Sequence, residues 1–130
     1  MKRLIIAATC LTGLFLSTGS ALAAPTICVS EAWRPSEDHG DGNVPKYAFV
    51  SNRFDAMWRA STDSLEMANR FGDAVGGQYG HDANGSPDLN INYSRCYQGD
   101  LGAAEAAFVN AVEHDIGAGP TQIIQVNWPQ

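Results

Sequence analysis

The first 23 residues restrict which part of the chain can fold and in which compartment it does so. A Lys-Arg pair precedes an apolar run from Leu4 to Leu16, and small residues follow as far as Ala21-Leu22-Ala23. A basic start, an apolar middle and an A-x-A end are typical of a secretory signal peptide. The apolar run is shorter than the roughly 18–20 residues that a membrane-spanning helix needs. We therefore expect cleavage after Ala23, and no membrane insertion of the remaining chain.

What remains, residues 24–130, has the length of one small domain. Of the three cysteines, Cys10 leaves with the signal, and the other two have no C-x-x-C spacing that would favour a metal site. Outside the cytoplasm such a pair is expected to oxidise. We therefore predict a disulfide between Cys28 and Cys96 in an exported protein, either periplasmic or secreted. The short Lys-Arg signal is typical of a bacterium.

The mature chain is strongly acidic. Loss of Lys2 and Arg3 from the eight basic residues leaves six against 14 acidic ones, a net charge of about −8. Such a charge disfavours binding to nucleic acid and to anionic membranes. It is compatible with a basic protein partner, although acidity also simply keeps proteins soluble.

Hydrophobic periodicity predicts four strands and two helices. The strands are expected at 26–33, 46–53, 89–97 and 121–128, and the helices at 61–78 and 100–116. In the first helix a buried stripe is predicted at Leu65, Ala68, Phe71 and Val75, with a stop at Gly76-Gly77. Asp100 is expected to cap the second helix.

This order, ββαβαβ, predicts an α+β fold, a two-layer sandwich with a four-stranded mixed or antiparallel sheet and both helices on one face. The strand at 89–97 alternates between apolar residues and Asn90, Asn92, Ser94 and Cys96, which indicates a polar, uncovered sheet face. Both predicted disulfide cysteines lie on small or polar strand faces. We therefore expect the strands at 26–33 and 89–97 to be neighbours, with the disulfide on the uncovered side.

Two acidic loops are candidates for cation or substrate chemistry. The first contains Glu37, Asp38, His39 and Asp41, and the second alternates Asp82, Asn84, Ser86 and Asp88 after His81. The second resembles the start of an oxygen-ligand calcium loop, but Pro87 and Tyr93 stand where the EF-hand needs Gly and Glu. Ordinary surface turns explain both loops more simply. No metal site is predicted beyond this calcium alternative.

Two other sets of residues are candidates for binding a partner. Trp58 and Arg59 form part of a Met-Trp-Arg cluster in a connecting segment, which is either an exposed recognition patch or part of the core. Asn90, Asn92 and Ser94 would lie on the uncovered sheet face, and Glu37, Asp38 and Asp41 add carboxylates in the first loop.

No catalytic signature is present, neither a G-x-S-x-G elbow nor an H-E-x-x-H motif. The leading hypothesis is therefore an exported, acidic, non-catalytic binding domain that inhibits or neutralises a basic protein. One alternative is a small secreted hydrolase that uses carboxylates and a histidine of the two acidic loops. Another is a calcium-stabilised envelope protein. No other cofactor is expected.

Overall fold

The computed structural model describes residues 22–114 and 118–130. It contains five strands and two α-helices. They are β1 (Ala24–Trp33), β2 (Val44–Ser51), β3 (Phe54–Ala56), α1 (Ser61–Tyr79), β4 (Asn90–Gln98), α2 (Leu101–Glu113) and β5 (Ala118–Val126). A short 3-10 helix, Pro35–Glu37, lies between β1 and β2. The predicted signal segment lies mostly outside the described residues.

The α+β prediction is confirmed, with a mixed sheet and two helices. The central strand β1 pairs antiparallel with β2 and β3 along one edge and with β4 along the other. Strand β5 then runs parallel to β2. The sheet thus has five strands rather than four, because the short β3 extends the pairing of β1 beyond the end of β2. No described helix is long and apolar enough to cross a membrane.

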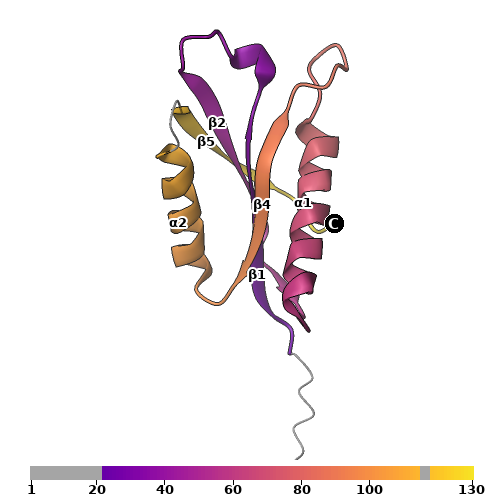
Figure 1. Cartoon of the computed structure of the whole chain (residues 1–130). Helices are drawn as coiled ribbons and strands as arrows, with labels where there is room; N and C mark the ends of the chain where they lie inside the picture. The colour runs from indigo at the N-terminus through magenta and orange to yellow at the C-terminus, as the bar shows by residue number, and fades with distance from the viewer. Residues whose placement is uncertain (1–21, 115–117) are drawn as a thin grey trace, which may run out of the picture.

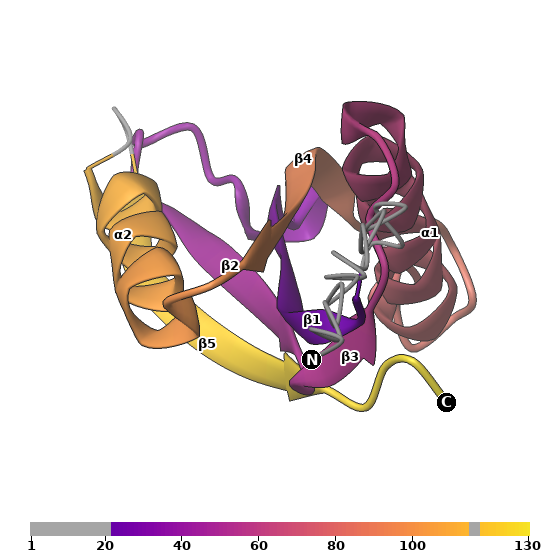
Figure 2. The ribbon, with the colours of Figure 1, turned by 90° about the horizontal axis from the view of Figure 1, so that it is seen from below.

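The two helices lie on opposite faces of the sheet, not on one face as expected (Figures 1 and 2). Ile27 and Val29 of β1 pack with Phe108 and Val112 of α2. Cys28 and Ala32, which alternate with them along the strand, pack with residues of α1. Every residue of β1 from Thr26 to Ala32 is consequently buried.

A bulge in β4 explains why the sequence pattern wrongly predicted a polar sheet face without a helix on it. Glu31 pairs with Tyr93 but the next residue, Ala32, pairs with Ile91, so Asn92 has no partner in the register. One extra residue reverses the alternation of side chains. Ile91 therefore faces α1 together with Cys96, whereas Tyr93 faces α2. Neither face of β4 is uniformly polar, and neither is left without a helix.

The predicted disulfide is present, and its place in the sheet is partly as expected. Cys28 and Cys96 are directly opposite each other on neighbouring strands, with a Cα–Cα distance of 4.0 Å. The two strands are therefore neighbours, as predicted. The expectation that the disulfide lies on an uncovered side is wrong, because Cys28 is fully buried under α1 with Phe71 and Val75.

Helix α1 approaches the sheet closely because a glycine of the helix lies against serines of the sheet. A Cβ atom on Gly72 would lie 2.8 Å from the Ser94 hydroxyl, which itself contacts the Ser30 hydroxyl at 2.6 Å. The buried stripe is Ala68, Phe71 and Val75. Two finer predictions for this helix are wrong: Leu65 is 61% exposed, and Gly76-Gly77 does not end the helix, which continues to Tyr79.

Helix α2 begins as expected. The Asp100 carboxylate accepts a hydrogen bond from the backbone N–H of Ala103 at 3.0 Å, which satisfies one of the free donors of the first turn. Leu101, Phe108 and Val112 form its buried stripe.

Candidate functional site: a groove beside helix α1

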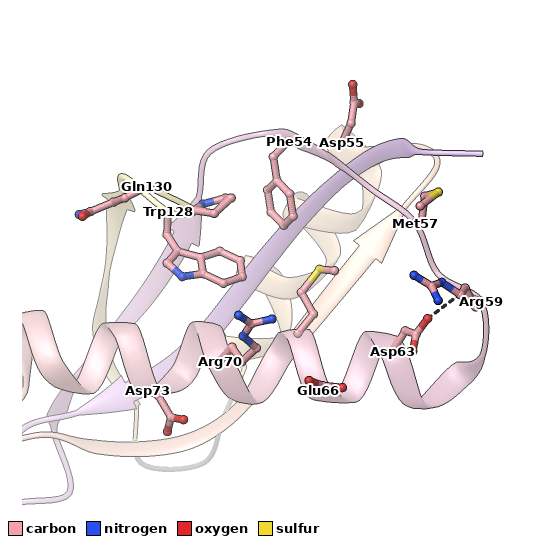
Figure 3. A pocket seen from close by; sticks show the side chains of 12 residues that line it. Phe54, Asp55, Met57, Arg59, Asp63, Glu66, Arg70, Asp73, Trp128 and Gln130 are labelled. Carbon is pink, nitrogen blue, oxygen red and sulfur yellow. Dashed lines mark hydrogen bonds between the residues drawn. The ribbon is translucent and has the colours of Figure 1, made fainter. Parts of the chain in front are cut away.

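A depression lies between α1 from Asp63 to Asp73, the segment from Phe54 to Arg59 and the chain end at Trp128–Gln130 (Figure 3). Its volume is about 880 Å³. Twelve residues line it, and they come from three segments that are far apart in the sequence. The groove therefore exists only in the folded protein.

The floor of the groove is apolar and aromatic. The Trp128 ring meets the Phe54 ring edge to face at 5.4 Å and the Phe71 ring at 5.3 Å. Phe71 is fully buried, so Trp128 packs against the core. Met67 and Met57 add thioether side chains, and Met57 is 50% exposed. Methionine adapts to partners of different shape, which suits a binding surface.

The rim of the groove is charged, and its acidic side chains outnumber its basic ones. Its carboxylates come from both banks, Asp55 on β3 and Asp63, Glu66 and Asp73 on α1, against two arginines, Arg59 and Arg70. Asp63 accepts a hydrogen bond from the backbone N–H of Arg59 at 2.7 Å, which fixes the turn before the helix. Arg70 points toward Trp128 in Figure 3. The rim thus carries two more negative than positive groups.

One part of this groove was predicted from the sequence. Arg59 lines it, but its predicted companion Trp58 does not. Trp58 is half-buried, and its indole N–H is shielded from solvent with no hydrogen-bond partner among the described residues. The contributions of Trp128 and Met67 were missed, because Trp128 has the sequence pattern of a core residue, Met67 lies outside the predicted helix stripe, and only the tertiary structure brings them beside β3.

The three polar residues of β4 do not form a common open face. Ser94 lies under α1 against Ser30. Asn92, at the bulge, donates a hydrogen bond to the Glu31 carboxylate at 2.7 Å. Asn90 is exposed where the strand begins. The bulge separates these residues, so the predicted polar binding face is not present as such.

A buried polar network around Glu31 was not predicted. Glu31 is only 1% exposed, and its carboxylate lies 3.4 Å from the Lys46 ammonium group. On the same face, burial and the nearby Glu31 carboxylate raise the pKa of Tyr93 to about 12. The signal in the sequence was a glutamate in the middle of an otherwise apolar and small-residue strand. Such a buried charge requires a partner.

The two acidic loops meet at one end of the sheet through structural contacts. The Asp88 carboxylate accepts hydrogen bonds from the backbone N–H and the hydroxyl of Ser36, at 3.0 and 2.5 Å, and these bonds lower the pKa of Asp88. Arg34 donates to the Tyr79 carbonyl at the end of α1 and to the Asp88 carbonyl. The loops are therefore fastened to each other and to the helix.

The carboxylates of the first loop bond within that loop or to the neighbouring strand β2. Glu37 accepts a hydrogen bond from the Tyr47 hydroxyl, whose pKa is raised by burial and by this carboxylate. Asp38 and Asp41 accept backbone N–H groups two residues further along the chain. These are turn-forming bonds, and they give the hydrolase alternative no supporting observation.

The calcium alternative likewise gains no support. The Asp82 carboxylate accepts the backbone N–H groups of Asn84 and Ser86, which closes the turn. The fourth candidate ligand, Asp88, is bonded to Ser36. Within residues 22–114 and 118–130, no group of three or more His, Cys, Asp or Glu side chains is placed to hold a metal ion.

Comparison of the chain with protein-family models, with curated proteins and with solved structures finds no significant match.

Proposed function

We propose that this chain is an exported, acidic, non-catalytic domain that binds a basic protein partner through the groove beside α1, and thereby inhibits or neutralises it. The observation that carries the proposal is the combination of an aromatic floor packed on the core with an acid-rich rim. Aromatic anchors surrounded by polar groups are typical of the energetic centre of protein interfaces.

Each part of the groove has a separate task in this proposal. An apolar side chain of the partner packs on Phe54, Met57 and Trp128, where burial of apolar area supplies most of the affinity. Lysine or arginine side chains beside it lie near Asp55 on one bank and Glu66 on the other. Charges at a rim chiefly accelerate association and select the sign of the partner.

Export to a bacterial periplasm or to the medium is part of the proposal. The disulfide is compatible with an oxidising compartment. Strand β1 begins at Ala24, directly after the signal segment that the sequence predicts. The net charge of the mature chain, about −8, favours a basic partner on approach.

The test uses immobilised mature protein and the exported fraction of its native host. Proteins retained at low salt are identified, and their affinities for the wild type and for two variants are measured. The double variant Asp55→Lys with Glu66→Lys reverses one charge on each bank of the groove. The double variant Asp38→Lys with Asp41→Lys makes the same change of net charge in the first loop, and serves as the matched control.

We expect the groove variant to bind a retained basic protein about tenfold more weakly than the control variant. Recovery of no basic protein at low and moderate salt would contradict the proposal. Equal weakening by both variants would also contradict it, since overall charge rather than the groove would then explain the binding.

A further inference from the structure

We infer that the open edge of β5, together with the α2 surface beside it, binds an extended, basic segment of another polypeptide by strand addition. This inference does not depend on the groove beside α1, which lies on the other face of the sheet. It rests on the direction of the backbone groups of β5, on a second groove and on the distribution of charge.

Strand β5 is at the margin of the sheet (Figure 2), and no described strand pairs with its outer side. The Val126 carbonyl accepts a hydrogen bond from the backbone N–H of Asn52, at the end of β2. Backbone groups alternate in direction along a strand. The N–H and C=O groups of Ile124 therefore also point to β2, whereas those of Ile123 and Gln125 point outward. The N–H and C=O groups of these two residues form an open edge.

Past the irregular pairing at its start, between Ala118 and Thr121, this edge lacks the features that usually protect one. Strand β5 contains no charged residue, and its only proline, Pro120, lies near its start. Natural edge strands are commonly blocked by lysines, prolines or bulges. The middle of β5 is therefore competent to pair with another strand.

A shallow groove of about 510 Å³ runs between Ile123 and α2. Its apolar part is made by Ala106, Val109 and Ile123, and Ile123 is 51% exposed. Glu105 and Glu113 lie along the helix side of the same groove. A strand added to β5 would thus place its side chains alternately against this groove and against the other face of the sheet.

The charge of the region identifies the occupant. The chain has no lysine or arginine after Arg95, so no lysine or arginine of α2 or β5 lies beside Glu105 and Glu113. A second copy of this acidic chain would bring the same glutamates to the interface, where like charges repel. A segment with an apolar residue opposite Ile123 and basic residues two positions away on either side complements the groove.

The probe is the peptide acetyl-Lys-Thr-Val-Thr-Lys-amide, added to isotope-labelled mature protein. In antiparallel pairing its valine lies opposite Ile123, and both lysines lie on the α2 face. The valine N–H then points to β5, whereas the threonine N–H groups point away. Methylation of the valine nitrogen and methylation of one threonine nitrogen give a matched pair of control peptides.

Amide hydrogen exchange measured by NMR is the main readout. In the free protein we expect rapid exchange at Ile123 and Gln125 and slower exchange at Ile124 and Val126. Millimolar peptide should slow exchange at Ile123 and Gln125 by about tenfold. The threonine-methylated peptide should do the same, and neither the valine-methylated peptide nor an analogue with glutamates for lysines should do so.

Protein variants complete the test. Ile123→Lys should abolish the effect of the peptide, whereas Gln122→Lys, with the same charge on the opposite side of the strand, should largely retain it. The inference is overturned if millimolar peptide leaves the β5 amides unchanged, or if it perturbs only residues of the α1 groove, such as Met57. Protection of Ile123 that rises with protein concentration in the absence of peptide would also overturn it and would identify a second copy as the occupant.

Discussion

Glu31 has an ionisable side chain and lies in β1, the most completely buried of the described strands. Its carboxylate is 1% exposed and has the Lys46 ammonium group and the Asn92 amide as neighbours. Removing one member of such a pair leaves the other charge buried without compensation, whereas replacing both members by apolar groups can be nearly neutral.

We therefore predict that Lys46→Met lowers the free energy of unfolding by about 3 kcal/mol. The double variant Glu31→Met with Lys46→Met should recover most of this loss, and urea unfolding of the two single variants, Glu31→Met and Lys46→Met, and of the double variant measures these effects. If the two single losses simply add in the double variant, the pair is not coupled and this interpretation is wrong.

Tyr93 provides a test at alkaline pH. Burial, and then the Glu31 carboxylate, raise the pKa of Tyr93 from its ordinary value of 10.0 to about 12. The folded state thus disfavours the phenolate, and its stability falls as pH rises from about 10 to about 12. Phenolate absorbance should show a tyrosine with this late midpoint in the wild type that is missing from Tyr93→Phe, and the variant should lose less stability over the same pH range.

At the scale of elements, the contact between α1 and the sheet depends on the absence of side chains. Gly72 lies so close to β4 that a Cβ atom would be 2.8 Å from the Ser94 hydroxyl, whereas nothing lies within 4 Å of one at Gly77. Both glycines are in the same helix, where alanine is intrinsically better by about 1 kcal/mol.

Gly77→Ala should therefore stabilise the protein by up to about 1 kcal/mol. Gly72→Ala should instead destabilise it by about 1 kcal/mol, because the helix must move or the contact between Ser94 and Ser30 must break. Adding Ser94→Ala should restore part of this loss. Thermal unfolding of the three variants measures the effects, and a stabilising Gly72→Ala would show that the close approach is not required.

At the scale of the whole molecule, the disulfide joins the central strand β1 to β4 across 68 residues of sequence. Closing a loop of this length restricts the unfolded chain and contributes up to about 4 kcal/mol of stability. The double variant Cys28→Ala with Cys96→Ala should lose an amount of this order in urea unfolding. In the wild type, neither cysteine should react with a thiol label without denaturant and reductant, and labelling of the folded protein would contradict the bond.

Local patterns predicted most of the elements. Alternation identified the strands apart from the short β3, helical periodicity located α1 and α2, and Asp100 capped its helix as expected. The pairing of Cys28 with Cys96 was also accessible, because a single candidate partner remained once Cys10 was assigned to the signal. These features depend on neighbouring residues or on simple elimination, and the sequence contains the information directly.

The covering of both sheet faces and the groove beside α1 were decided by the tertiary structure. The bulge at Asn92 reverses the alternation of β4, and nothing in its local sequence marks it. Small residues such as Ser30 and Gly72 look like an uncovered surface in a pattern, yet they allow α1 to pack closely on the sheet. Trp128 and Phe54 become one site only because the chain returns to β3 after β5. Strand register and long-range contacts depend on interactions between residues that are far apart in the sequence. No local pattern in the sequence can therefore specify them.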